Sequence, residues 1–342
     1  MNNPQNAALV ANSERDEITI YAVGGAGINL GLKLQNAMRG RTASIFGRVR
    51  VVFADTSRSN VTAAVPESDC YIMKGCDGAG KKRDEHAQLI IERTPEILLK
   101  FKPTKHNIVI GSAGGGSGSV LGPSIVSQLL AKGEAVTAIT IGSTATLKDA
   151  ENTLNTLKSY EGAVRMRERP VGLTYLENSH ELSRAKIDER VIQFVTCMAV
   201  LFSGNNAELD SQDLHNWRDF HRVTSFGPRL AFLDIVGGER EVNMSDDRVL
   251  ISVATLSAQD RDSAIHGATP EYQAVGYVSP DAKEAHEPLP IHFMLFDGVF
   301  RPIVDRLSEL VTRLKDEAEA RRASSSSVLS SHDRVESNGL VL

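Results

Sequence analysis

Cysteine and clustered metal ligands are scarce in this sequence. Its three cysteines, Cys70, Cys76 and Cys197, show no spacing typical of a zinc site, and at least one must lack a disulfide partner. The nine histidines are scattered along the chain. We therefore expect free thiols in a reducing compartment and no structural transition metal.

Long apolar runs and an excess of basic residues are also missing. The longest apolar run, residues 191–202, is shorter than the roughly 20 residues of a membrane-spanning helix and contains Gln193 and Thr196. Residues 1–17 are polar and lack the apolar core of a signal peptide. The net charge is −5, so we expect no direct binding to DNA or to an anionic membrane. These features predict a cytoplasmic protein.

Glycine is abundant where a predicted strand meets a predicted helix. Residues 107–110 form a short apolar run typical of a buried strand, and apolar residues recur at helical spacing over 120–130. Between them lies Gly-Ser-Ala-Gly-Gly-Gly-Ser-Gly-Ser, residues 111–119. A flexible linker would not be flanked by a buried strand and an amphipathic helix. Glycines let an anion approach the backbone, and a helix N-terminus supplies unpaired N–H groups, so the segment predicts a phosphate-binding loop.

The order of the glycines excludes two common phosphate-binding motifs. A Walker loop ends in Gly-Lys-Ser/Thr, but this run ends in Gly118-Ser119-Val120. The dinucleotide motif Gly-x-Gly-x-x-Gly would need a glycine at Leu121. The unbroken run Gly-Gly-Gly-Ser-Gly-Ser-Val-Leu-Gly-Pro, residues 114–123, instead resembles the signature loop of the tubulin/FtsZ superfamily of GTPases. It is most similar to that of the bacteriophage-encoded tubulins of the PhuZ type.

Two further glycine turns follow predicted strands. The strand at 18–23 ends in Gly-Gly-Ala-Gly-Ile-Asn, residues 24–29. The strand at 70–73 leads into a turn at 75–83 that ends in three cations. Parallel strands carry ligands at their carboxyl ends, so three such loops together predict a site for a di- or triphosphate.

The remaining elements indicate an α/β protein with two unequal domains. Helices are expected up to Met38 and at 84–100, 119–131, 183–202, 260–266 and 301–322, and a polar loop that runs into a helix is expected over 144–167. Further strands are expected at 49–53, 107–111, 135–141, 171–175, 229–236, 249–256, 274–278 and 291–296. The helix at 183–202 is apolar on most sides, which is typical of a helix buried between layers. In the helix at 301–322, Ile303, Leu307, Leu310 and Leu314 have the spacing of a packing seam.

The resemblance implies a tubulin/FtsZ-like architecture. It has a GTP-binding domain with a doubly wound parallel sheet at 18–182, a central helix at 183–203, a synergy loop with a smaller α+β domain at 204–300, and a long C-terminal helix at 301–322. Residues 1–17 are expected to be a disordered N-terminus. Residues 323–342 are expected to be a flexible tail, whose apolar end reaches the next subunit.

The resemblance also implies the residues of a nucleotide site. The expected contacts are Gly24, Gly25, Ala26, Gly27 and Asn29 in the first loop; Asp55 and Thr56 after the second strand; Gly78, Ala79 and Gly80 at the γ-phosphate; Gly114, Gly115, Gly116, Ser117, Gly118 and Ser119 in the signature loop; Thr144 and Asn152 at the ribose; and Asn178, Arg184 and Asp188 at the base. Magnesium, bound through the GTP phosphates, would neutralise their charge.

Three of these regions have an alternative interpretation. Asp55 can bind a ribose or cap the turn that follows its strand. The cations of 81–83 (Lys81, Lys82 and Arg83) can hold the γ-phosphate or lie on a solvated face. Asp188 fits guanine, whose N1–H and 2-amino group are adjacent donors, but it can also be an acid favoured by the positive end of its helix.

Two acids follow the central helix. Asp210 and Asp213 are three residues apart and share one face of a helix start, which by itself is an ordinary acidic N-terminus. By resemblance they are the catalytic acids of the synergy loop. That loop enters the nucleotide site of the neighbouring subunit, where its acids orient or deprotonate the attacking water.

The resemblance therefore implies a GTPase that binds GTP and GDP with Mg²⁺ and polymerises with itself, head to tail, into dynamic filaments. In the cytoplasm of an infected bacterium such filaments would position phage DNA or its compartment. Two other classes remain open. An NAD(P)-dependent Rossmann oxidoreductase would explain the first βαβ unit and Asp55, but not the signature loop or the acid pair. A nucleotide-binding scaffold would polymerise without hydrolysis.

Overall fold

The structure is a computed structural model that describes residues 17–40, 46–76, 80, 83–179, 182–238, 248–258, 268–278 and 288–324. The strands are β1 (Glu17–Val23), β2 (Arg48–Asp55), β3 (Cys70–Ile72), β4 (His106–Ser112), β5 (Val136–Ser143), β6 (Val171–Asn178), β7 (Leu230–Gly237), β8 (Val249–Ser257), β9 (Tyr272–Tyr277) and β10 (Ile291–Asp297). The helices are α2 (Gly24–Met38), α3 (Arg83–Lys100), α4 (Ser117–Ala131), α5 (Leu147–Arg167), α6 (Arg184–Leu201), α7 (Ser211–Arg218) and α8 (Phe300–Ser324). The helix predicted at 260–266 lies outside the described residues.

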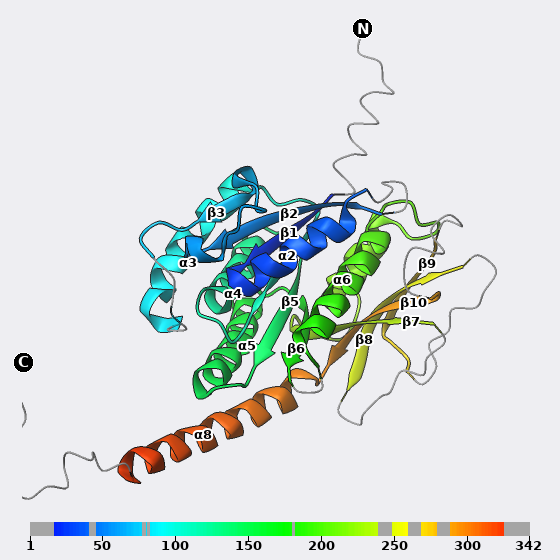
Figure 1. Ribbon diagram of the computed structural model, residues 1–342. Helices are drawn as coiled ribbons and strands as arrows, with labels where there is room; N and C mark the ends of the chain where they lie inside the picture. Colours follow the sequence, from blue (N-terminus) through cyan, green and yellow to red (C-terminus); the bar gives the residue numbers. More distant parts are fainter. Residues whose placement is uncertain are drawn as a thin grey trace, which may run out of the picture.

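One sheet organises these elements. Its strands have the order β3-β2-β1-β4-β5-β6-β7-β10-β8-β9, and those from β3 to β7 are parallel (Figure 1). The crossovers from β1 to β2 and from each of β3, β4, β5 and β6 to the next strand contain an α-helix, as is usual in a parallel sheet. The crossover from β2 to β3 contains two short 3₁₀ turns, Arg58–Asn60 and Glu67–Asp69. The predicted α/β class with a doubly wound parallel sheet is confirmed.

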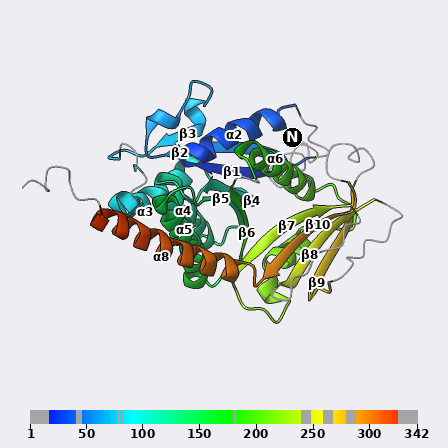
Figure 2. The same cartoon turned by 60° about the horizontal axis from the view of Figure 1, so that its bottom comes forward.

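Alternate residues of the parallel strands point to opposite faces of the sheet, and helices cover both faces. In β1, Ile18, Ile20 and Ala22 belong to the core cluster that contains α2 and α6. Tyr21 and Val23 belong to the cluster that contains α3, α4, α5 and α8. Figure 2 shows α2 and α6 on one side of the sheet and α4, α5 and α8 on the other. Both faces are buried, which explains why these strands are almost continuously apolar.

The central helix α6 connects the two parts of the molecule. Val191, Val195 and Met198 are fully or nearly fully buried, and their core cluster also contains Leu256 of β8 and Phe293 of β10. The helix therefore packs against both halves of the sheet, as its apolar sequence predicts. Its far end leads into the loop that precedes α7.

The strands of the C-terminal half extend the same sheet. β7 pairs in parallel with β6, where Val171–Leu173 face Leu230–Phe232. β10 then pairs antiparallel with both β7 and β8, and β9 lies parallel to β8. Figure 2 shows these four strands fanning away from the first part. The smaller second domain predicted from the sequence is thus joined to the first through its sheet.

The C-terminal helix α8 packs on α5 through its first half. Leu307 and Val311 are buried in the cluster that contains α5, and Leu310 and Leu314 are partly buried against it, as the predicted seam requires. Ion pairs from Arg306 to Glu177 and from Lys315 to Glu151 add to this contact. Beyond Lys315 most of the described side chains are exposed, and Figure 1 shows the helix projecting from the body.

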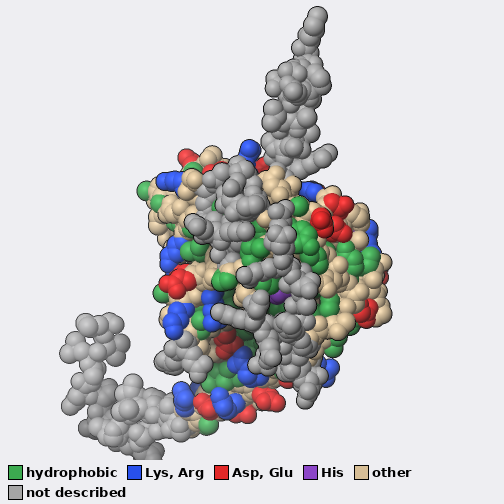
Figure 3. Space-filling view, turned by 90° about the vertical axis from the view of Figure 1, so that its right-hand side faces the viewer, with side chains coloured by type: hydrophobic (Ala, Val, Ile, Leu, Met, Phe, Trp, Pro, Cys, Tyr) green, Lys and Arg blue, Asp and Glu red, His purple; other side chains and the backbone are tan. Residues whose placement is uncertain are grey.

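Charges of both signs are mixed on the surface. Figure 3 shows one face, on which acidic, basic and hydrophobic side chains of the described residues lie interspersed. Within the described ranges, no helix is both long and apolar enough to cross a membrane.

Candidate functional site

The predicted glycine loops meet at the carboxyl ends of β1, β2 and β4. They surround a cavity of about 330 Å³. Its lining consists of small or hydroxylated residues and one amide, namely Gly24, Gly25, Ala26, Ser57, Ser59, Asn60, Gly80, Ser112, Gly115, Gly116, Ser117 and Gly118. The structure therefore brings together residues that lie almost a hundred positions apart in the sequence. Ser57, Ser59 and Asn60 were not predicted, although they form a polar run directly after a strand.

Backbone contacts between the loops explain why the glycines are needed. Gly24 has φ +69°, and a Cβ at this position would lie 2.8 Å from the Gly118 nitrogen. A Cβ on Gly27 would lie 2.7 Å from the Ile110 carbonyl oxygen. Such distances leave no room for a side chain, and a positive φ strains any residue with a Cβ. The first loop and the signature loop can meet only because both are glycine at these points.

Two helix N-termini open onto this cavity. α2 begins at Gly24 and α4 begins at Ser117, and the residues before them, Val23 and Gly116, supply no side-chain cap. The first N–H groups of a helix have no partner within the helix and carry its positive dipole end. Both helices can therefore donate to an anion in the cavity.

Asp55 and Thr56 fix the loop that follows β2. The Asp55 carboxylate is buried and accepts hydrogen bonds from the Thr56 nitrogen and from Asn60 Nδ2, both at 2.7 Å. The Thr56 hydroxyl lies 2.5 Å from that of Ser117 at the start of α4. Of the two interpretations of Asp55, the structure supports the turn cap, since both carboxylate oxygens are engaged within the loop. The ribose contact typical of an NAD(P) site therefore has no support.

Arg83 binds the fold rather than the cavity. Its guanidinium donates to the Ser119 carbonyl oxygen at 2.5 Å, to the Thr156 hydroxyl at 2.9 Å and to the Ser159 hydroxyl at 2.5 Å. These bonds tie the start of α3 to α4 and α5. The predicted contacts Gly78 and Ala79, and the cations Lys81 and Lys82, lie outside the described residues.

The two residues predicted at the ribose support the loops around the cavity. Asn152 is buried, and its Nδ2 donates to the carbonyl oxygens of Gly114 at 3.2 Å and Gly115 at 3.3 Å. The Thr144 hydroxyl donates to Glu177 at 3.3 Å. Neither residue lines the cavity. A ribose contact for them remains a prediction.

The predicted base-reading residues lie around the start of α6. Asn178 and Arg184 are exposed, and so is Asn29 on α2. Asp188 is buried and forms an ion pair with Lys33 of α2. Sequence reasoning missed Lys33, although it stands four residues after Asn29 and hence on the same face of α2.

Asp210 and Asp213 form a capping box at the start of α7. Asp210 Oδ1 accepts from the nitrogens of Gln212 and Asp213 at 2.6 and 2.9 Å, and Asp213 Oδ2 accepts from the Asp210 nitrogen at 3.0 Å. Hydrogen bonds from these backbone N–H groups hold the pKa of Asp210 below its usual value. Asp210 is therefore a carboxylate at neutral pH, with a local structural role of the kind that the sequence also allowed.

The acid pair lies near the amino ends of the parallel strands, whereas the glycine loops follow their carboxyl ends. Asp210 lines a different cavity of about 650 Å³, together with Lys105 and with His106, the first residue of β4. The signature loop follows the other end of β4. A strand of seven residues spans roughly 23 Å, so the acids cannot reach the glycine-lined cavity of the same chain.

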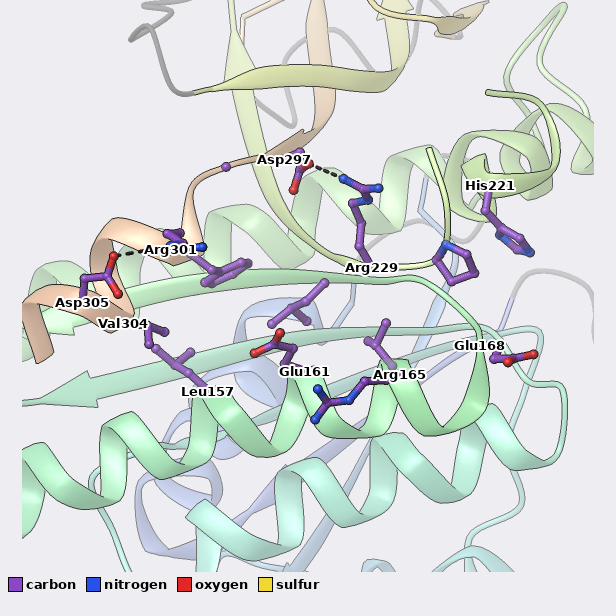
Figure 4. A pocket seen from close by; sticks show the side chains of 15 residues that line it. Leu157, Glu161, Arg165, Glu168, His221, Arg229, Asp297, Arg301, Val304 and Asp305 are labelled. Carbon is purple, nitrogen blue, oxygen red and sulfur yellow. Dashed lines mark hydrogen bonds and ion pairs between the residues drawn. The ribbon is translucent and has the colours of Figure 1, made fainter. Parts of the chain in front are cut away.

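A larger cavity, of about 750 Å³, lies on the α5 and α8 side of the molecule (Figure 4). Its lining mixes apolar residues such as Leu157 and Val304 with the ion pairs Arg229–Asp297 and Arg301–Asp305. None of the predicted site residues line it. Among the described residues, no three His, Cys, Asp or Glu side chains are grouped as a metal site.

The fold and the glycine-lined cavity define a tubulin-like protein. The chain belongs to the phage tubulin-like proteins: it is 30% identical over 258 residues to the phage tubulin-like protein of Pseudomonas phage PhiPA3, covering 75% of this chain and 78% of that one. The family described as "Phage tubulin-like protein, C-terminal domain" matches residues 209–297.

Solved structures show the same fold. The protofilament of TubZ from bacteriophage PhiKZ has a TM-score of 0.77 and 26% identity, covering 95% of this chain and 99% of that one. The GDP complex of the phage tubulin PhuZ has a TM-score of 0.79 and 23% identity, with the same coverage. The predicted resemblance to the phage tubulins and the predicted fold class are confirmed.

Proposed function

We propose that this chain is a GTPase that assembles head to tail into filaments, with each active site completed by the neighbouring subunit. The observation that carries the proposal is the separation of two half-sites. Two uncapped helix N-termini and three loops face one cavity, and the acid pair lies at the opposite edge of the same sheet.

GTP would place its phosphates in the glycine-lined cavity. The N–H groups at the starts of α2 and α4 and the hydroxyl of Ser117, which Thr56 contacts, would donate to phosphate oxygens. The PhuZ structure with GDP supports a guanine nucleotide. Mg²⁺ would be held mainly by the β- and γ-phosphate oxygens and by water, and would neutralise their charge. The hydroxyl oxygens beside the cavity suit such a hard cation.

Hydrolysis would need a neighbour. α6 has 18 residues and so spans about 27 Å, with Asp188 in its first turns and the acid pair beyond its end. In a head-to-tail contact, the acid pair of one subunit would lie against the glycine-lined cavity of the next. Such a heterologous contact, repeated without closing into a ring, builds a filament. The neighbour's Asp210 or Asp213 carboxylate would then orient or deprotonate the attacking water.

The cellular role follows from family likeness. Filaments of this chain in the cytoplasm of an infected bacterium would position phage DNA or its compartment without direct contact of the subunit with DNA or membrane. The PhiKZ protofilament supports self-assembly as the basis of that role.

Sedimentation combined with phosphate release tests the proposal. The protein is incubated with GTP, GDP or NAD at several concentrations, and the pelleted fraction and the phosphate released are measured. We expect pelleting with GTP, and phosphate release per subunit that rises steeply with protein concentration. Pelleting without phosphate release would favour the non-hydrolysing scaffold. Phosphate release per subunit that does not depend on protein concentration would exclude a shared active site.

A further inference from the structure

Among the described residues, the Asp188 carboxylate is contacted by Lys33, which comes from a different helix. The Lys33 ammonium on α2 pairs with Asp188 Oδ2 on α6. The Lys33 side chain is 53% exposed, whereas that of Asp188 is only 12% exposed. A largely buried carboxylate thus has its charge balanced by a cation that remains accessible to solvent.

The position of Lys33 connects it to the phosphate site. α2 begins at Gly24 in the glycine-lined cavity and carries Lys33 nine residues further, about 13 Å along the helix axis. Asn29 and Lys33 are both exposed and lie on the same face of α2. A nucleotide whose phosphates bind at Gly24 and whose base reaches Asp188 must pass along this face.

The pair of charges matches the edge of guanine. Guanine presents an acceptor, O6, beside two donors, N1–H and the 2-amino group. A carboxylate only accepts hydrogen bonds and an ammonium only donates them. Adenine presents an amino donor and an unprotonated N1 at the corresponding positions, so it would set donor against donor and acceptor against acceptor.

We propose that Lys33 is a specificity-determining residue, which donates to guanine O6 while Asp188 accepts from N1–H and the 2-amino group. The proposal rests on the proposed GTP-binding function and adds a residue to its base site. The Lys33 ammonium already contacts one oxygen of the Asp188 carboxylate. When that carboxylate accepts a hydrogen bond from N1–H of guanine, the ammonium therefore lies close to O6, which is on the carbon next to N1. In the nucleotide-free state the same ammonium neutralises Asp188.

A purely structural role accounts less well for the pair. Ion pairs with one largely exposed partner contribute little to stability, and Lys33 makes its contact from a solvent-facing position. Discrimination by base-reading groups is large, because a wrong base leaves buried polar groups unpaired. The pair therefore has more effect on nucleotide choice than on folding.

Base analogues distinguish a contact at O6 from contacts elsewhere on guanine. Affinities are measured for GTP, for ITP, which lacks the 2-amino group but keeps O6 and N1–H, and for 2,6-diaminopurine riboside triphosphate, which keeps the 2-amino group but has an amino group in place of O6 and no hydrogen on N1. For each nucleotide, the ratio of the wild-type affinity to that of a Lys33 variant isolates the effect of Lys33. Lys33→Met should weaken GTP and ITP about 10- to 100-fold, as expected for loss of a charge-assisted hydrogen bond. The diaminopurine nucleotide should be unchanged or bind better. Lys33→Arg, which keeps a donor, should retain most of the preference for O6.

A matched control uses a neighbouring lysine. Lys186 is exposed on α6, two residues before Asp188, so Lys186→Met removes the same charge from the same region and should leave all three affinities unchanged. If Lys33→Met weakened the binding of all three nucleotides equally, or changed none of them, Lys33 would not determine specificity. The proposed function of the protein as a GTP-binding protein would still stand. A wild-type protein that binds none of these nucleotides would instead overturn the proposed function itself.

Discussion

Among the cavity glycines, Gly115 has room for a side chain. A Cβ there would meet only Ser112, at 3.7 and 3.8 Å, which is ordinary contact. We expect Gly115→Val to fold with nearly unchanged stability but to lose GTP binding, because the branched side chain would fill the space that phosphate oxygens need. Thermal unfolding measures the stability of the variant, and nucleotide titration measures its GTP affinity. Tight GTP binding by the variant would show that the phosphates lie elsewhere.

Gly24 lines the same cavity but should respond in the opposite way. Gly24→Ala combines a positive φ with a Cβ 2.8 Å from the Gly118 nitrogen. We expect a loss of about 1–3 kcal/mol in the free energy of unfolding, because the two loops must separate or the backbone must change. Urea unfolding of both variants measures the contrast. Equal stability of Gly24→Ala and Gly115→Val would contradict the close approach of the loops.

For individual residues, the sequence predicted the positions of the loops better than it predicted which side chains contact one another. Glycine runs after apolar strands were enough to locate the cavity, because steric freedom and strand polarity are local properties. The cap role of Asp55 depends on Asn60, and the contacts of Arg83 depend on two other helices. The Lys33–Asp188 pair joins residues 155 positions apart, and nothing local in the sequence indicates it.

Among the elements, α7 carries the acid pair and is anchored by one buried carboxylate. Asp219 pairs with Arg169 at 3.2 Å, with Arg218 at 3.4 Å and with His215 at 3.1 Å. Asp219→Ala would leave Arg218 largely buried without its partner. We expect a loss of roughly 3–5 kcal/mol, measured by urea unfolding. Asp305→Ala is the control: its side chain is 61% exposed and, within the described part of the chain, pairs with Arg301, so the loss should stay below about 1 kcal/mol.

The pH dependence of this anchor has a defined sign. Burial alone would raise the pKa of Asp219, but Arg218, Arg169 and His215 outweigh it and hold the pKa below its usual value. A carboxylate with a lowered folded-state pKa stabilises the fold above its unfolded pKa of about 3.9 and loses that contribution as the pH falls. The stability difference between wild type and Asp219→Ala should therefore shrink as the pH falls below about 4. His215 is already protonated in that range, so its titration does not mask the effect. A difference that grew as the pH fell below about 4 would contradict this assignment.

Helices and strands with a strong apolar pattern were predictable from the sequence. Short helices and the pairing between strands were less predictable. The strands β1 to β6 and the helix α6 were evident because both faces of the sheet, and most sides of the helix, are buried. α7 has eight residues with only Leu214 and Trp217 buried, which is too little periodicity to predict the whole helix. The β6–β7 pairing was not visible because strand pairing is a tertiary contact.

For the whole molecule, the decisive test is hydrolysis shared between subunits. Asp210→Asn keeps an N-cap for α7, since Asn caps as well as Asp, but removes the carboxylate. We expect this variant to bind GTP and assemble normally but to hydrolyse about 10²- to 10⁴-fold more slowly, so that its filaments persist. Phosphate release and sedimentation, measured together, check this.

Mixing two inactive variants tests the sharing directly. Gly115→Val subunits still offer their acids, and Asp210→Asn subunits still hold GTP. Co-assembled, the two should recover part of the turnover that each lacks. The absence of any recovery in filaments that contain both subunits would contradict a shared site.

The placement of the glycine loops and the acid pair at opposite edges makes the two ends of the proposed filament chemically different. At one end of the proposed filament, the last nucleotide would have no acid against it and would stay as GTP until another subunit arrived. One such nucleotide would exist per protofilament, whatever its length. Short filaments would therefore be rich in GTP and long ones almost entirely GDP, so nucleotide content would report length.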